Sequence, residues 1–247
     1  MSFENKTALV TGASAGIGYG IAKALVDAGA RVIITGRHAE RLDKAVAELG
    51  PNASGIVADA TKVADLRRLF DTLKADHGHL DVLIANAGGG EPVPLVDVTE
   101  QHVDDTLTWN LKSTIFSVQF ALPIMPSGGA IVLIGSNASK AAPIGMSVYA
   151  AAKAGVRALV TGWVQEIKGS GVRINVVSPG PVRTPGLEGF FAAEEAEATF
   201  DFLAGQSTVG RIGTTDDIAA ATLFLAGDTA GYINGIELFV DGGAARL

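Results

Sequence analysis

The chain contains no cysteine. Disulfide bonds and thiolate zinc sites are therefore excluded, because both need cysteine sulfur. Histidine is scarce, and His38, His77, His79 and His102 show no metal-ligand spacing. We interpret His77 and His79, which flank a glycine, as solvated loop residues. The sequence therefore predicts no metal site.

Positive charge and long apolar runs are also lacking. Lys and Arg number 19 against 26 Asp and Glu, a formal net charge of −7. Nucleic acids and anionic membranes attract clustered basic residues, so neither is expected as a partner. No apolar run is long enough to span a bilayer, and Lys6 leaves no room for a signal peptide before the first strand. We expect a soluble, cytoplasmic protein.

Short apolar runs and amphipathic stretches instead alternate along the whole chain. Helical spacing of Ile17, Ile21 and Leu25 is followed by a stop at Gly29, and Thr214 begins a helix with acids in its first turn. Such alternation predicts a doubly wound (Rossmann-like), mostly parallel seven-stranded sheet with helices on both faces, in a single α/β domain over 1–247. The expected strands are 7–10, 31–35, 55–58, 81–85, 130–135, 172–178 and 236–240.

A glycine-rich turn connects the first strand to the first helix. Gly12, Gly16 and Gly18 would let a diphosphate approach bare backbone at the helix N-terminus. Their spacing differs from the G-x-G-x-x-G fingerprint, and an ordinary glycine-containing loop is the alternative. Further motifs follow the ends of later strands, where doubly wound sheets bind their ligands: Asn86, Ser136 and Pro179.

The end of the second strand bears on the choice of cofactor. A carboxylate there would hydrogen-bond the adenine ribose of NAD, but the residues are Thr35, Gly36 and Arg37, with no acid before Glu40. Arg37 can pair with a 2′-phosphate or stack on adenine. The alternative, an exposed arginine at the start of a helix, does not explain the missing carboxylate. NADP(H) is favoured, and NAD(H) remains open.

Tyr149 and Lys153 lie four residues apart, so on a helix they share a face. A nearby ammonium and the positive charge of an oxidised nicotinamide favour the phenolate, and we expect them to lower the tyrosine pKa from its usual value of about 10. Lys153 could also bind the nicotinamide ribose, and Ser136 could stabilise charge on a carbonyl oxygen. The alternative for the pair alone is a surface tyrosine beside a solvated lysine.

Taken together, these motifs resemble the short-chain dehydrogenase/reductase family along essentially the whole chain. Thr11-Gly-x-x-x-Gly-x-Gly18 resembles its cofactor turn, Asn86-Ala-Gly88 the motif after its fourth strand, and Asp241-Gly-Gly243 its terminal strand. The resemblance implies a catalytic set of Asn110, Ser136, Tyr149 and Lys153. The implied cofactor-binding residues are Gly12, Ser14, Gly16, Ile17, Gly18, Arg37, Asp59, Asn86, Ala87, Gly88, Tyr149, Lys153, Pro179, Gly180, Val182 and Thr184.

The roles of these residues follow from the resemblance. It implies Tyr149 as general acid/base, Lys153 as ribose ligand, Ser136 as the group that polarises the carbonyl, and Asp59 as the acid that holds the adenine amino group. Asn110 would hold a water in a proton relay; from its own sequence context it would be a polar helix residue. Three departures are Ala85 for an asparagine, Ala152 for a serine, and Ala15 where many NADP-preferring members carry a basic residue.

Residues 185–205 have the composition of a substrate lid. Phe190, Phe191, Phe200 and Phe202 would form its apolar face, with Gly186 and Gly189 as hinges. A plain helix packed on the core is the alternative for Phe200 and Phe202. Pro143, Ile144 and Met146 should also face the pocket. Because this part of the chain offers no cation clamp for a carboxylate, we expect a neutral or apolar ketone or aldehyde.

Two other functions stay open. A 3-oxoacyl-[acyl-carrier-protein] reductase would need a local basic patch for its acidic carrier, to which Lys112, Arg157 and Arg173 are possible contributors. A non-catalytic nucleotide-sensing protein would have no reason to keep the catalytic set. The resemblance also implies a homotetramer, formed through the helices that carry Tyr149 and Asn110 and through the C-terminal strand region.

Overall fold

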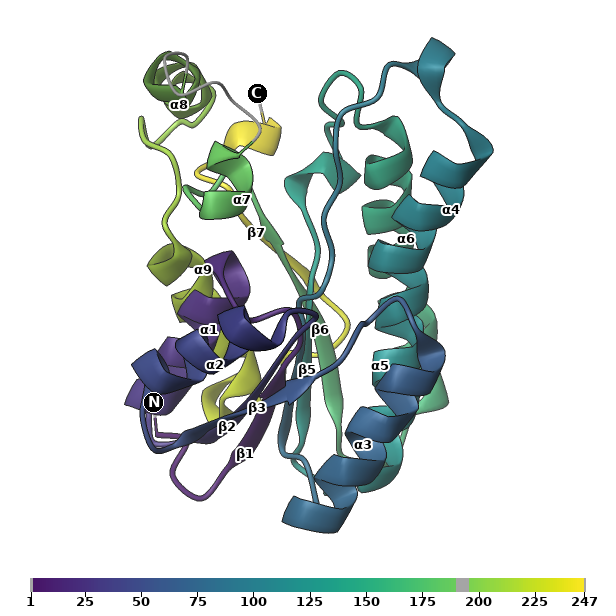
Figure 1. Ribbon diagram of the computed structural model, residues 1–247, viewed down its shortest axis with the longest axis vertical. Coiled ribbons are helices and arrows are strands. Elements are labelled where there is room, and N and C mark those ends of the chain that lie inside the picture. Colours follow the sequence, from purple (N-terminus) through teal and green to yellow (C-terminus); the bar gives the residue numbers. More distant parts are fainter. Residues whose placement is uncertain (1, 190–195, 247) are drawn as a thin grey trace.

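The computed structural model describes residues 2–189 and 196–246 (Figure 1). Its strands are β1 (Thr7–Val10), β2 (Arg31–Gly36), β3 (Ala53–Val57), β4 (Val82–Ala85), β5 (Ala130–Ile134), β6 (Arg173–Pro179) and β7 (Glu237–Val240). Its α-helices are α1 (Gly16–Asp27), α2 (Ala39–Leu49), α3 (Val63–His77), α4 (Glu100–Leu107), α5 (Ser113–Ala121), α6 (Ser147–Glu166), α7 (Pro185–Glu188), α8 (Ala196–Gly205) and α9 (Thr215–Ala226). Short helical turns are η1 (Leu95–Asp97), η2 (Thr108–Lys112), η3 (Leu122–Ile124), η4 (Asn137–Ser139), η5 (Asp228–Ala230) and η6 (Ala244–Arg246).

The strands form one sheet in the order β3-β2-β1-β4-β5-β6-β7, and every neighbouring pair is parallel. The predicted doubly wound sheet is confirmed, and it is wholly rather than mostly parallel. All seven predicted strands are present, although most ends differ by one or two residues. The largest shift is in β3, which begins at Ala53 because that residue already pairs with Val32.

Two apolar cores lie on opposite faces of the sheet because successive strand residues point to opposite sides. Val10 and Ile34 pack with Ile21 of α1, Leu42 of α2 and Ile218 of α9. Figure 1 shows α1, α2 and α9 on that face, with α3, α5 and α6 on the other. The residues of the second core include Leu9, Ile33, Leu66, Leu69, Leu83, Val118, Val156 and Val160.

Helix ends follow local signals. Thr214 caps α9 in a full capping box, its hydroxyl accepting from the Asp217 N–H while the Asp217 carboxylate accepts from the Thr214 N–H, as the sequence predicted. The interpretation of His77 as a loop residue was wrong, because it is the last residue of α3 and its side chain is partly buried.

The carboxyl ends of the strands meet at one edge of the sheet. The winding reverses between β1 and β4, which pair directly. Loops after β4 and β6 lead to α4 and α7 at this edge, at the top of Figure 1. None of the helices in the described ranges is both long enough and apolar enough to cross a bilayer.

Candidate active site

The glycine turn lies at the crossover between β1 and β4. Gly12 and Gly16 have φ of 64° and 62°, a conformation that favours glycine. A Cβ on Gly18 would come within 2.4 Å of the Asn86 side-chain nitrogen. At the start of α1 no described side chain caps the helix, and its first turn holds no acid. Unpaired N–H groups at a helix start are suited to a diphosphate, so this turn fits a dinucleotide.

Asn86 joins the ends of β1 and β4. Its side-chain amide donates to the carbonyl oxygens of Thr11 and Gly12, each at 2.9 Å. The Thr11 hydroxyl accepts from the N–H groups of Asn86 and Ala87. These bonds fix the glycine turn against the loop after β4. Ala87 and Gly88 of that loop line the cleft beside the turn.

A cleft of about 190 Å³ opens beside this turn. Among the described residues that line it, Asp59 is the one carboxylate, while Arg37 and Arg41 carry positive charge and His38 lies between them in the sequence. Both Asp59 oxygens have neighbours: Oδ1 accepts from Thr61, and Lys62 Nζ lies 3.9 Å from Oδ2. The remaining lining residues are Gly12, Ser14, Thr35, Gly36, Ala58, Ala60, Ala87, Gly88 and Trp109.

Trp109 is a cleft residue that the sequence reasoning missed. The Arg37 guanidinium carbon lies 5.3 Å from the centroid of its ring, a cation–π contact across the cleft. The indole also covers Gly89, where a Cβ would come within 2.7 Å of the ring. Its place directly before Asn110 was the available signal.

Ser136, Tyr149 and Lys153 come together at the neighbouring strand ends. Ser136 follows β5, and its hydroxyl lies close enough to the Tyr149 phenol to lower the pKa of that group. Lys153, one turn after Tyr149 on α6, is 4% exposed, and its Nζ lies 5.7 Å from the Tyr149 ring centroid. The Lys153 ammonium donates to the Ile134 carbonyl oxygen at 2.9 Å. The structure therefore contradicts the alternative of a surface tyrosine beside a solvated lysine.

Burial dominates the acid–base properties of this group. It raises the pKa of the Tyr149 phenol, and the nearby Ser136 hydroxyl opposes this by a smaller amount. Burial also lowers the pKa of Lys153 to about 8. The expectation of a lowered tyrosine pKa was therefore wrong for the protein without cofactor, because desolvation outweighs the other influences.

Asn110 is fully buried in η2, a π-helical turn between α4 and α5. Its side-chain oxygen accepts from the Gly89 N–H at 3.0 Å, and its nitrogen donates to the carbonyl oxygens of Gly89 and Thr106. A Cβ on Gly88 would lie 2.7 Å from the Asn110 oxygen and 3.2 Å from Lys153 Nζ. Asn110 thus lies on the Lys153 side of the site and holds the loop after β4.

The segment after β6 approaches the glycine turn. Pro179 is the last residue of β6, and Gly180 lies so close to Asp241 that a Cβ would be 2.8 Å from its Cα. Val182 is buried, and the Thr184 side chain caps α7 and lies near Gly16. Ser14 lines the cleft, whereas Ile17 packs partly buried against the core beneath it.

The predicted lid is only partly described, because Phe190 and Phe191 lie outside the described residues. Phe200 is 3% exposed and lies under the Arg183 guanidinium, in agreement with the alternative of a helix packed on the core. Phe202 is 66% exposed. Ile144, expected to face the pocket, is 99% exposed. That it faces the substrate pocket stays a prediction.

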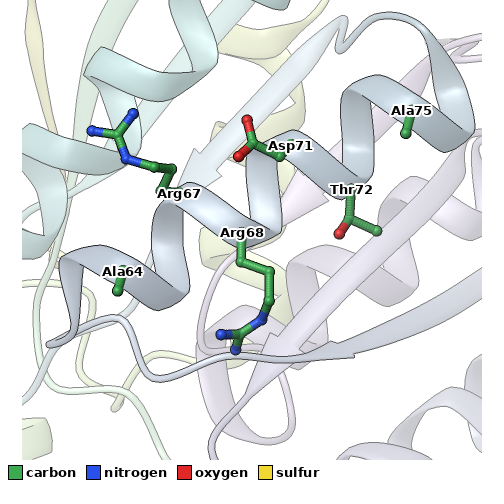
Figure 2. Close-up of a pocket in the computed structure, with 6 residues that line it drawn as sticks. All are labelled: Ala64, Arg67, Arg68, Asp71, Thr72 and Ala75. Atoms are coloured by element: carbon green, nitrogen blue, oxygen red, sulfur yellow. The ribbon is translucent and has the colours of Figure 1, made fainter.

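A separate hollow of about 520 Å³ runs along α3 (Figure 2). One helix supplies every residue that lines it, and Arg67 and Arg68 extend to different sides of that helix. Arg67 packs over the Phe120 ring at 4.7 Å, and Arg68 pairs with Asp65 at 3.1 Å. Since none of the residues assigned to cofactor or catalysis lines it, this hollow is distinct from the site.

Comparison with known proteins agrees with this geometry. A family model described as Enoyl-(Acyl carrier protein) reductase matches residues 12–245. A solved short-chain type dehydrogenase/reductase from Mycobacterium ulcerans superposes with a TM-score of 0.92 at 32% identity, covering 100% of this chain and 92% of that one. The chain belongs to the short-chain dehydrogenase/reductase family.

Its relatives within the family have diverse names. The chain is 39% identical to oxidoreductase asL5 of Sarocladium schorii, over 98% of this chain and 96% of the relative. It is 35% identical to 4-formylbenzenesulfonate dehydrogenase TsaC1/TsaC2 of Comamonas testosteroni (98% and 99%). It is 34% identical to 3-oxoacyl-[acyl-carrier-protein] reductase FabG of Salmonella typhimurium (98% of each).

Membership of this family makes the chain an oxidoreductase that uses a nicotinamide cofactor and acts on small-molecule substrates. The substrates in the relatives' names differ, so the family does not by itself choose among them.

Proposed function

We propose that this protein is an NADP(H)-dependent reductase of neutral or apolar ketones or aldehydes, with the secondary or primary alcohol as the reverse substrate. The observation that carries the proposal is the meeting of two groups of residues at Gly88. On one side is the cleft with the glycine turn and Arg37, and on the other are Asn110 and Lys153, with Tyr149 and Ser136 beyond them.

The reaction needs one hydride and one proton. A nicotinamide cofactor held by the residues of the cleft would supply the hydride for the carbonyl carbon. Tyr149 donates its phenolic proton to the carbonyl oxygen, a role that suits its burial, since the raised pKa keeps the phenol protonated near neutral pH. Ser136 donates a hydrogen bond to the same oxygen as its negative charge develops.

Lys153 stabilises the phenolate that remains. With a pKa of about 8 it is mostly protonated at neutral pH, and its ammonium lies near the Tyr149 ring. The same ammonium, which lies close to Gly88, would also hold a ribose hydroxyl of the cofactor. Asn110 positions the loop that carries Gly88 through its hydrogen bonds to Gly89. In the direction of alcohol oxidation, each proton transfer runs in reverse.

The choice of NADP(H) rests on the charge at the end of β2. Arg37 and Arg41 line the cleft, and the strand end itself offers no carboxylate to a ribose diol. A 2′-phosphate would gain charge-assisted hydrogen bonds from these guanidinium groups. Arg37 is already held over Trp109, which places it at the cleft before cofactor arrives.

A neutral substrate is supported by the state of the arginines near the site. Arg183 pairs with Glu188 at 3.2 Å and also with Glu197, and Arg211 pairs with Asp217 at 2.7 Å. Each would have to give up these ion pairs before it could clamp a substrate carboxylate.

A 3-oxoacyl-[acyl-carrier-protein] reductase is the second candidate, favoured by the 34% identity to FabG of Salmonella typhimurium. One of the three cations expected to form its carrier patch is engaged within the fold. The Arg173 guanidinium donates to the carbonyl oxygens of Leu225 and Gly227. We therefore favour a free carbonyl compound over a carrier-bound one.

The test is a comparison of substrates and cofactors with purified protein. NADPH and NADH oxidation are followed with a panel of neutral ketones and aldehydes, with matched keto acids, and with an acetoacetyl-carrier protein. We expect turnover on neutral carbonyls with NADPH preferred. Turnover confined to the carrier-bound thioester would favour the second candidate, and NADPH binding without turnover on any carbonyl would favour a nucleotide sensor.

A further inference from the structure

Outside the residues assigned to catalysis, one buried carboxylate connects the elements that carry them. Glu237 is the first residue of β7, and its side chain is 9% exposed. Its Oε1 accepts from the Ser178 hydroxyl at 2.6 Å and from the Ser139 hydroxyl at 3.0 Å. Its Oε2 faces Arg157 at 3.6 Å.

Each partner belongs to a different element of the active site. Ser139 ends η4, the turn that Ser136 begins, and Ser136 itself accepts from the Ala138 N–H at 3.1 Å. Ser178 lies on β6, where it directly precedes Pro179, the last residue of the strand. Arg157 is one turn beyond Lys153 on α6. One carboxylate therefore joins the serine turn to the end of β6, just before the segment that approaches the glycine turn.

We propose that Glu237 is a positioning residue, whose hydrogen bonds through Ser139 and Ser178 hold the Ser136 hydroxyl in place against Tyr149. This rests on the roles proposed above for Ser136 and Tyr149. A carboxylate at this depth needs hydrogen-bond donors, and the two serines supply them, so the position of one group constrains the others. The Arg157 contact contributes little, since that side chain is 55% exposed.

The variants separate position from charge. Glu237→Gln keeps an oxygen acceptor for both serines and removes only the charge. Glu237→Leu removes the acceptor and leaves both hydroxyls without it, and Ser139→Ala breaks only the link to the serine turn. Asp81→Asn is the matched control: its carboxylate is also 9% exposed and accepts from the Thr7 N–H, but it precedes β4, at the opposite end of the sheet.

The first readout needs no substrate. The phenol of Tyr149 is titrated by the difference in absorbance between each variant and its Tyr149→Phe counterpart, which removes the signals of Tyr19 and Tyr232. Because the Ser136 hydroxyl lowers the Tyr149 pKa, we expect Glu237→Leu and Ser139→Ala to raise it, as we expect of Ser136→Ala. Glu237→Gln and Asp81→Asn should leave the Tyr149 titration unchanged.

The second readout is steady-state kinetics with NADPH and a ketone that the wild type reduces. We expect kcat to fall by roughly 10- to 100-fold in Glu237→Leu, with the KM for NADPH little changed, because a displaced catalytic group affects the chemical step. Glu237→Gln should retain most of kcat. An unchanged Tyr149 titration in Glu237→Leu, with a loss of melting temperature like that of Asp81→Asn, would overturn the proposal. Absence of ketone turnover in the wild type would instead count against the proposed function, and the titration would still decide the role of Glu237.

Discussion

At the scale of single residues, Lys153 combines burial with charge. Among the described contacts, the Lys153 ammonium donates one hydrogen bond, to the Ile134 carbonyl oxygen, and it pairs with no carboxylate. An ammonium without a counter-ion in such a place is unfavourable for folding, and a catalytic role explains why it is kept there. The same residue therefore links function to stability.

The pH dependence of stability follows from the sign of this shift. The folded pKa of Lys153, about 8, lies below the model-peptide value of 10.5, so its contribution favours folding above that value and is lost as pH falls through about 8. The full difference is on the order of 3 kcal/mol at about 1.4 kcal/mol per pKa unit. In denaturant unfolding, the free energy of unfolding of the wild type should rise relative to that of Lys153→Met as the pH increases from about 8 to 10.5. A difference in stability that stays constant over this window would contradict the burial of a charged lysine.

Arg37 determines cofactor choice in this account. We expect Arg37→Asp to lower kcat/KM for NADPH by roughly 10- to 100-fold, the value of a charge-assisted hydrogen bond, and to leave kcat/KM for NADH equal or higher. Arg68→Asp on α3, whose ion pair with Asp65 lies outside the cleft, is the control for the change of charge. Equal losses with both cofactors would show that Arg37 does not read the 2′-phosphate.

At this scale the sequence was most informative where a residue type is needed by the chemistry. Tyr149, Lys153 and Ser136 could be named because their types and spacing are unusual together. Trp109 was missed, although it directly precedes Asn110, because an aromatic residue in a helical stretch is more often part of the core. The direction of the Tyr149 pKa shift could not be predicted either, because it depends on burial, which the spacing of residues does not reveal.

At the scale of elements, the strand-to-helix turn depends on close approach. We expect Gly18→Ala to cost roughly 1–3 kcal/mol of stability and to weaken NADPH binding, because the methyl group would displace the Asn86 amide that joins β1 to β4. Gly162→Ala, within α6 and with its nearest neighbour 3.9 Å away, should instead gain about 0.5–1 kcal/mol. Both are measured by denaturant unfolding and by energy transfer from protein to NADPH. Unimpaired NADPH binding by Gly18→Ala would contradict this description of the turn.

Element boundaries could be predicted where local signals are strong. The capping box at Thr214 and the end of α2 before Gly50 match the sequence patterns. The π-helical turn over Thr108–Lys112 could not be foreseen, because neither glycine nor proline marks it. It places Asn110 where both ends of its amide reach Gly89, so its position depends on the packing of the loop rather than on its own propensity.

At the scale of the whole molecule, the C-terminal region leaves apolar surface uncovered. β7 is an edge strand, and near it Phe224, Tyr232 and Ile236 are 36%, 104% and 38% exposed. Edge strands with apolar neighbours are usually covered, and a second copy of the chain is the partner that the family resemblance implies. We propose that this surface forms one interface of a homotetramer.

The test of assembly is the mass of the particle in solution. We expect the wild type to be tetrameric by light scattering after size exclusion, and Tyr232→Asp with Ile236→Asp to halve that mass while the monomer fold persists. Val57→Asp, an exposed apolar residue on the other edge strand, is the control. A wild type that runs as a monomer would contradict the proposed interface.

The central claim is that Tyr149 delivers the proton in NADPH-dependent carbonyl reduction. The most direct measurement compares NADPH oxidation by wild type and Tyr149→Phe with the same ketone, while NADPH binding is followed by energy transfer from the protein. The account predicts turnover by the wild type, and in the variant near-complete loss of turnover with NADPH still bound. A Tyr149→Phe protein that reduces the ketone at the wild-type rate would contradict it.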